Sequence, residues 1–166
     1  MNKLFLAGLL FAGVLSNNVW AAKHLKAEES IEINAKAGDV WAKVSNYGDL
    51  GAWHPAVKST EIIEGKSNEK DAVRVLTLQD GGTIKEKLEF YSAARKRYSY
   101  TILEGVLPVS DYRSTISVKA ISADKTKVTW RGKFQSTGAS DEDALKTISG
   151  VYRGGLDNLK KISEAK

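Results

Sequence analysis

The 166-residue chain contains no cysteine, one methionine (Met1) and only two histidines, His24 and His54. Without cysteine it can form no disulfide, thiolate zinc site or iron–sulfur cluster, and it has no cysteine nucleophile. The two histidines and the scattered carboxylates show no metal-ligand spacing, and no glycine-rich phosphate loop follows a candidate strand. We therefore expect neither a metal nor another cofactor.

Proline is scarce too, with two residues, and the 14 glycines show no collagen-like repeat. Hydrophobic residues make up 42% of the chain, and 25 Lys and Arg against 20 Asp and Glu give a formal charge of +5. A chain of this length buries enough surface to fold without covalent staples. The composition predicts one ordinary globular domain with a modest excess of positive charge.

Residues 1–21 have the three parts of a secretory signal peptide: a cation at Lys3, an apolar run from Leu4 to Leu15, and a polar stretch before Ala21. The alternative is an N-terminal membrane anchor, but the apolar run is well short of the roughly 20 residues that span a bilayer. We prefer the signal and place cleavage after Ala21. The prediction is a periplasmic protein without a membrane anchor, whose residues 22–166 form a single domain that lacks sulfur and suits an oxidising compartment.

The first part of the expected domain consists of short elements. Residues 22–29 are charged and aperiodic and predict a short tail, and residues 30–35 alternate as a half-buried strand does. Asp39 is placed to N-cap a short helix with Trp41 on its buried side. The turn-rich residues 46–55 predict a second short helical turn.

The rest of the chain predicts an antiparallel sheet and one long helix. Turn residues such as Asp80-Gly81-Gly82 separate the strands, so sequential strands should pair. Apolar residues then recur every three or four positions from Ala144 to Ile162, which predicts an amphipathic helix of about 22 residues. Its glycines, Gly150, Gly154 and Gly155, allow either close packing on the sheet or room for a cavity. The expected strands are 57–64, 72–78, 83–92, 98–104, 110–121 and 126–137.

This order of elements resembles a known superfamily. The residues that carry the resemblance are Asp39-Val40-Trp41, Trp53-His54-Pro55, Arg74 before Asp80-Gly81-Gly82, Glu86-Lys87-Leu88, Tyr98, Tyr112 and Val128-Thr129-Trp130. The chain is similar to the START-like, or Bet v 1-like (SRPBCC), superfamily over about residues 28–163, and to its polyketide cyclase/dehydrase-type branch. The resemblance implies an α+β helix-grip fold, in which a curved antiparallel sheet of about seven strands wraps around a long C-terminal helix, with two short helices after the first strand.

With the predicted export signal, the chain further resembles the periplasmic MxaD-type proteins of methanol oxidation. That resemblance implies an accessory role at methanol dehydrogenase and its cytochrome c partner. It does not come from any residue spacing.

The superfamily binds apolar ligands between the sheet and the long helix, so polar residues that face inward are candidate site residues. Glu86 shares a strand face with Ile84, Leu88 and Phe90, and Arg74 on the neighbouring strand is its natural partner. The pair is either a structural ion pair or a polar contact for a ligand, with Glu86 as an acid of raised pKa.

His54 could act as a general acid or base near the cavity mouth, or it could be structural. The aromatic residues could line a cavity or belong to an ordinary sheet core. The cavity residues that we predict are Trp53, His54, Arg74, Glu86, Leu88, Tyr98, Tyr112, Trp130, Phe134 and Tyr152.

The cluster Arg95-Lys96-Arg97, with Lys85 and Lys87, predicts positive charge at one end of the sheet. Such a patch attracts acidic partners, for example an acidic cytochrome, or is a solvated edge. No nucleic-acid reader motif is present, so we expect no nucleic-acid partner.

Three functions therefore stay open. The first is an accessory or binding protein that assists methanol dehydrogenase. The second is a cyclase- or dehydrase-type enzyme with His54, Glu86 and Arg74 as acid/base residues. The third is a carrier of a lipid or small apolar molecule.

Overall fold

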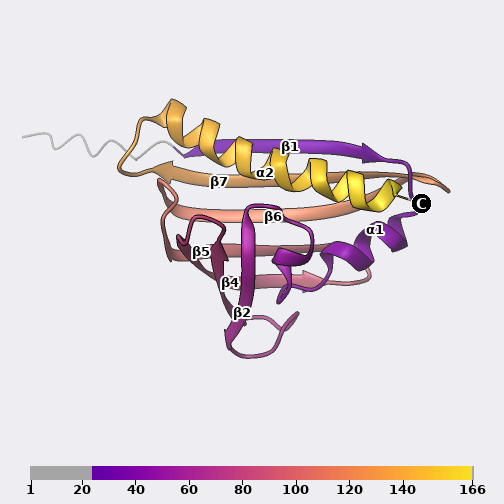
Figure 1. The fold of residues 1–166 in the computed structure, drawn as a ribbon, viewed down its shortest axis with the longest axis horizontal. Coiled ribbons are helices and arrows are strands. Elements are labelled where there is room, and N and C mark those ends of the chain that lie inside the picture. Colours follow the sequence, from indigo (N-terminus) through magenta and orange to yellow (C-terminus); the bar gives the residue numbers. More distant parts are fainter. Residues whose placement is uncertain (1–23, 166) are drawn as a thin grey trace, which may run out of the picture.

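The computed structural model describes residues 24–165, which fold as a curved sheet with one long helix on its concave side (Figure 1). The predicted signal peptide, residues 1–21, lies outside the described residues. Within the described range no helix has the length and apolar character to cross a membrane. In chain order the elements are β1 (Leu25–Ile33), α1 (Ala37–Val44), the 3-10 turn η1 (Leu50–Ala52), β2 (Val57–Glu64), β3 (Val73–Leu78), β4 (Thr83–Ser92), β5 (Arg97–Gly105), β6 (Val109–Ser122), β7 (Lys125–Ser136) and α2 (Asp141–Glu164).

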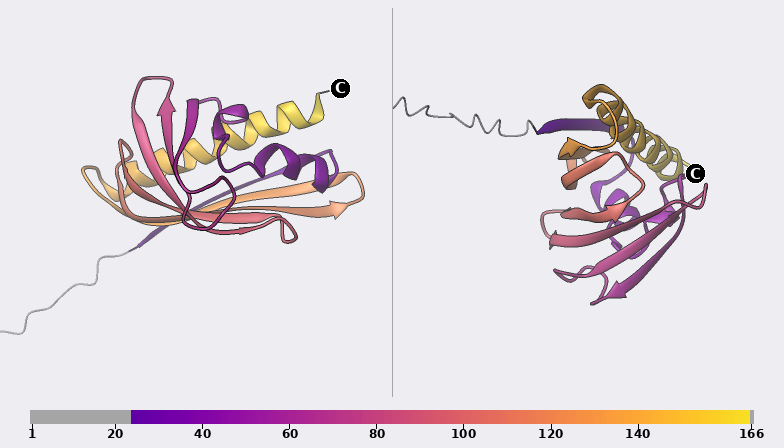
Figure 2. Two further views of the ribbon diagram at one scale, coloured as in Figure 1. Left: turned by 90° about the horizontal axis from the view of Figure 1, so that it is seen from below. Right: turned by 90° about the vertical axis from the view of Figure 1, so that its left-hand side faces the viewer.

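The seven strands form one antiparallel sheet in the order β1-β7-β6-β5-β4-β3-β2. Strands β2 to β7 follow one another as hairpins because their connections are short. Strand β1 joins the far side of β7, so the first and last strands are neighbours. Figure 2 shows the sheet end-on, with α2 along the concave side of the curve. This is the predicted helix-grip α+β fold, with a short α-helix and a 3-10 turn after the first strand.

Helix α2 closes the concave side by packing mainly on β1 and also on β7 and α1. Its buried face comes from the predicted three-to-four spacing and includes Ala144, Ile148, Tyr152, Leu156 and Leu159. Ser140 caps the helix, since its hydroxyl accepts a hydrogen bond from the Asp143 N–H at 3.1 Å. The core therefore lies between α2 and the inward side chains of the sheet.

The first strand begins earlier than the sequence indicates. Residues 22–29 were expected to form a charged tail, but β1 starts at Leu25, which pairs with Phe134 of β7. Leu25 and Ala27 are buried, whereas Lys26 and Glu28 are exposed. The sequence analysis missed this alternation because charged residues predominate in the segment.

Helix α1 also begins one turn earlier than predicted. Asp39 is not its N-cap: Lys36 occupies that position, without a side-chain hydrogen bond, and Asp39 lies in the first turn. An acidic residue in the first turn still interacts favourably with the helix dipole. Trp41 is buried as predicted.

Two glycines allow close contacts in the core. A Cβ at Gly155 of α2 would lie 2.6 Å from His54 Cδ2 and 2.9 Å from Trp130 Cζ3, and a Cβ at Gly132 of β7 would lie 2.2 Å from the Tyr152 hydroxyl. At Gly150 and Gly154 nothing lies within 4 Å of such a Cβ. Close packing therefore explains Gly155, and neither packing nor a cavity explains Gly150 and Gly154.

Candidate functional site

The inner face of the sheet holds a buried ion pair between β3 and β4. Arg74 and Glu86 are directly opposite in the strand register, and they are 0% and 4% exposed. Arg74 Nε donates to Glu86 Oε2 at 2.7 Å, and Nη2 lies 2.6 Å from the same oxygen without hydrogen-bond geometry. The sequence-based pairing of these two residues thus has a direct structural counterpart.

Aromatic rings and a backbone carbonyl complete the surroundings of Arg74. Its Nη1 donates to the Tyr47 carbonyl at 2.6 Å, and its guanidinium carbon lies 4.0 Å from the Tyr47 ring centroid and 5.3 Å from that of Tyr100. Burial raises the pKa of Glu86, while the charge of Arg74 opposes that shift. A buried charge is tolerated when it is paired and hydrogen-bonded, so this arrangement accounts for Arg74 without a ligand.

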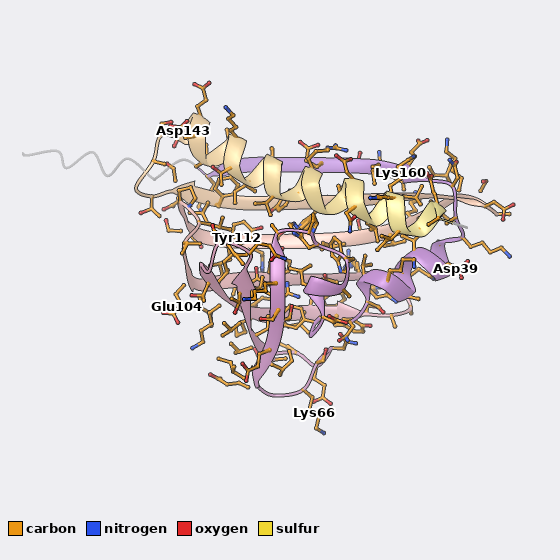
Figure 3. The ribbon with its side chains drawn as sticks, in the orientation of Figure 1. Asp39, Lys66, Glu104, Tyr112, Asp143 and Lys160 are labelled. Carbon is orange, nitrogen blue, oxygen red and sulfur yellow. The ribbon has the colours of Figure 1, made fainter. Side chains whose placement is uncertain are left out.

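A chain of hydroxyl groups lies beside the ion pair, towards α2. The Tyr112 and Tyr152 hydroxyls are 2.5 Å apart, and the Ser114 hydroxyl lies 3.1 Å from that of Tyr152. Trp130 Nε1 donates to Ser114 at 2.9 Å and to the Tyr100 hydroxyl at 3.1 Å. Figure 3 shows Tyr112 within the outline of the molecule, whereas Lys66, Glu104 and Asp143 lie at its rim.

Burial keeps these phenols protonated. It raises the pKa of Tyr98 to about 12, and it raises the pKa values of Tyr100, Tyr112 and Tyr152 further above the usual range. Protonated phenols donate and accept hydrogen bonds but do not act as bases near neutral pH. The network can therefore orient a polar group without removing a proton from it.

His54 connects the end of η1 to α2. The Ala56 N–H donates to its Nδ1 at 3.2 Å, so the proton lies on Nε2, which donates to the Val151 carbonyl at 3.0 Å. The ring is 3% exposed, and its burial lowers the pKa of His54. Both ring nitrogens are engaged by the backbone in this state, which favours the structural interpretation of His54 over the acid/base interpretation.

The concave side contains one small cavity near these groups, of about 70 Å³. Ligand sites for drug-sized molecules have volumes of about 300–1,000 Å³, so this space holds only a few non-hydrogen atoms. Of the predicted cavity residues, His54, Glu86, Tyr112 and Trp130 line it. Six others are buried but do not line it: Trp53, Arg74, Leu88, Tyr98, Phe134 and Tyr152.

Most of the remaining lining was not predicted. Its residues are Leu50, Ala56, Val57, Leu76, Leu78, Ile84, Tyr100, Ile102, Leu107 and Val151. Tyr100, which alternates with Tyr98 in the predicted strand 98–104, is one of the aromatic residues that the sequence offers either for a cavity or for an ordinary sheet core. The others are ordinary apolar residues, and only the curvature of the sheet selects them from the rest of the core.

Phe90 does not share the inner face with Glu86 as predicted. The β4–β5 register shifts between Leu88 and Phe90, and such a bulge moves the following side chains to the opposite face. Phe90 is 37% exposed, and the Arg97 guanidinium carbon lies 5.0 Å from its ring centroid. Tyr91 instead turns towards the core, where its ring contacts Trp41 and Tyr98.

The predicted basic cluster is not concentrated at one end of the sheet. Lys85 is opposite Glu104 near the start of β4, whereas Arg97 is opposite Ser92 at its other end. Lys85 Nζ lies 3.9 Å from Glu104, and Lys87 Nζ lies 3.4 Å from Glu89. Strand pairing therefore separates cations that are close in sequence and gives some of them acidic neighbours.

The comparisons with known proteins agree with this architecture. The family model described as "Polyketide cyclase / dehydrase and lipid transport" matches residues 24–164. The chain belongs to this family. None of the curated proteins matches the sequence.

Solved structures of family-like proteins cover nearly the whole described fold. The protein XoxI from Bacillus cereus is 32% identical, with a TM-score of 0.77 over 83% of this chain and 94% of that one. A protein from Nitrosospira multiformis is 28% identical, with a TM-score of 0.74 over 84% of this chain and 96% of that one. The ZhuI aromatase/cyclase from Streptomyces sp. R1128 is 17% identical, with a TM-score of 0.71 over 86% of this chain and 94% of that one, and this likeness shows the fold alone.

The described residues give the small cavity a limited set of titratable side chains. They are the Glu86 carboxylate, held by Arg74, the His54 imidazole and the protonated phenols of Tyr100 and Tyr112. Among residues 24–165 no group of His, Asp and Glu side chains is arranged to hold a metal ion. The geometry supports binding and orientation of a small group better than it supports proton transfer.

Proposed function

We propose that this chain is a periplasmic accessory protein of the START-like type, which assists methanol dehydrogenase and its exchange with an acidic cytochrome c by contact rather than by turnover. The observation that carries the proposal is the state of the interior. The charged groups Arg74 and Glu86 on the inner face of the sheet are paired with each other, and both ring nitrogens of His54 bind the backbone. The cavity beside them is small.

A sequence pattern and a resemblance support the proposed location and partners. The 1–21 segment has the pattern of a secretory signal, and the chain resembles periplasmic proteins of methanol oxidation. The positive net charge suits an acidic partner, because opposite charges speed association.

Calorimetry of residues 22–166 with purified methanol dehydrogenase and with its cytochrome tests this proposal. We expect binding that weakens as the ionic strength rises, because charges exposed to solvent are screened by salt. Absence of binding to both proteins at low salt would refute direct contact.

A second candidate function is ligand binding in the interior, as a carrier or as a cyclase- or dehydrase-type enzyme. The observation in its favour is that Glu86 lines an otherwise largely apolar cavity.

Two measurements separate the second candidate from the first. Native mass spectrometry of the purified protein should show a retained small molecule if it is a carrier. If it is an enzyme, Glu86→Gln should abolish turnover of an aromatic polyketide substrate, and unchanged turnover would eliminate Glu86 as the acid.

A further inference from the structure

The outer face of the sheet places like charges directly opposite one another. In the β1–β7 register Lys26 faces Lys133, and in the β6–β7 register Lys133 faces Arg113. Directly opposite side chains on antiparallel strands have Cβ atoms about 4.5–5.5 Å apart, and like charges there are destabilising. Elsewhere on β1 and β7, Glu32 faces Lys127, which is a favourable pair of opposite charges.

Nearby carboxylates neutralise only part of this charge: Glu28 lies opposite Arg131 in the β1–β7 register, but not within ion-pair distance. Among residues 24–165 no carboxylate lies within ion-pair distance of Lys26, Arg131 or Lys133. Arg113 binds Glu89 at 3.1 Å, but the same carboxylate also contacts Lys87 at 3.4 Å. The nearby Asp111 is held by His24 at 2.5 Å.

These cations surround a hollow in the protein surface. Its volume is about 610 Å³, far larger than that of the interior cavity, and its charged and polar lining includes Lys26, Glu28, Arg113, Thr115, Arg131 and Lys133. Arg and Lys side chains here are exposed, so their charges can reach an incoming group. The hollow and the repulsive row of charges therefore coincide.

We propose that this hollow, with the row Lys26–Lys133–Arg113, is the docking site for a carboxylate-rich surface of a partner protein. The inference rests on the proposed function, since it specifies which face meets the acidic partner. The row continues through Thr101 to Lys87. From β1 to β4 it spans four strand spacings, roughly 19 Å. A free small anion would contact only part of this length, whereas an acidic protein surface spans it.

The first test uses a fluorescein-labelled peptide of ten glutamates and residues 22–166, with fluorescence anisotropy at about 20 mM and about 150 mM NaCl. We expect salt-sensitive binding that Lys133→Glu weakens by about tenfold. The matched control is Lys58→Glu on the exposed part of β2, which changes the net charge equally. We expect it to weaken binding by less than about twofold, because it lies at the opposite edge of the sheet.

A second measurement shows that the variant is folded. Lys133→Glu places a carboxylate between Lys26 and Arg113, so its midpoint of thermal unfolding should rise by roughly 1–3 °C. Weaker peptide binding by a protein of higher thermal stability cannot be attributed to unfolding.

The remaining outcomes are distinct. Equal loss of peptide binding in Lys133→Glu and Lys58→Glu would refute a localised site, and citrate binding as tightly as the peptide would show a small-anion site instead. Unchanged binding of Lys133→Glu to methanol dehydrogenase or its cytochrome, if the wild type binds, would overturn the docking face but leave the proposed function. If neither protein binds while the peptide binds in a Lys133-dependent manner, the proposed partners fail and the acidic docking site stands.

Discussion

The two faces of the sheet differ in which charges lie opposite each other on neighbouring strands. On the inner face Arg74 lies directly across from Glu86 and both are buried. On the outer face Lys133 lies directly across from two other cations. Burial makes an unpaired charge very unfavourable, so the inner charges must neutralise each other, whereas water and salt reduce the repulsion outside. The inner pair therefore maintains the fold, whereas the outer row of cations can exist in water without a counter-charge for each member.

Removing one inner partner should have the largest effect. Arg74→Met leaves Glu86 buried without a counter-charge and removes the donor to the Tyr47 carbonyl. We expect a loss of about 3–5 kcal/mol in the free energy of unfolding, measured by urea denaturation at neutral pH.

The double variant Arg74→Met/Glu86→Leu is the control for this experiment. It should recover most of the loss, because an apolar pair of similar volume avoids the desolvation of both charges. A double variant no more stable than Arg74→Met would contradict a role limited to charge compensation.

A test of packing beside the inner pair uses neighbouring helical glycines. Gly155→Ala places a Cβ against His54 and Trp130, so it should lower the free energy of unfolding by about 1–3 kcal/mol. Gly154→Ala has open space around the new Cβ and should raise it by up to about 1 kcal/mol. Equal changes in the two variants would show that helix propensity, not contact with His54, decides the result.

His54 should make stability depend on pH. Its folded pKa is lowered by burial, so below about pH 6.5 the unfolded chain binds a proton that the folded protein resists. Stability should therefore decline as the pH falls below that value, by at most about 1.4 kcal/mol per pH unit. Urea denaturation of wild type and His54→Gln between pH 8 and pH 5 measures this effect. Titration of Glu86 affects both proteins, so the difference between them isolates His54. Parallel curves of unfolding free energy against pH would contradict a lowered pKa of His54.

The smallest effect is expected on the outer face. Raising the NaCl concentration should stabilise the wild type by a few tenths of a kcal/mol more than Lys133→Gln, because salt screens the repulsion that the variant has lost. Thermal unfolding at low and high salt gives the comparison. An identical salt response would mean that Lys133 is too far from Lys26 and Arg113 to be repelled by them.

The sequence was sufficient for most of the elements, because their periodicities are local, and the family resemblance supplied their arrangement. The predicted strands 57–64 and 83–92 agree with β2 and β4 at both ends, and the helix from Ala144 to Ile162 lies within α2. Errors occurred where a non-local contact decided the structure. Pairing with Phe134 extends β1 back to Leu25, and a bulge that depends on β5 turns Phe90 outward.

The candidate site was predictable only in part for the same reason. Arg74 and Glu86 could be paired from strand neighbours and the cost of burying a charge. The role of His54 could not, because the carbonyl that fixes its proton belongs to Val151 in a helix far along the chain. Likewise, the row Lys26–Lys133–Arg113 joins three strands and has no signature within any one of them.

The pairing of β1 with β7 also has a consequence for folding. Leu25 and Phe134, which are neighbours in the sheet, are separated by roughly a hundred residues of chain. The hairpins from β2 to β7 can form from local contacts, but β1 can dock only after β7 is present. Such distant pairing raises the contact order and slows folding. A ribosome must therefore complete most of the chain before the first strand in the sequence can join the sheet.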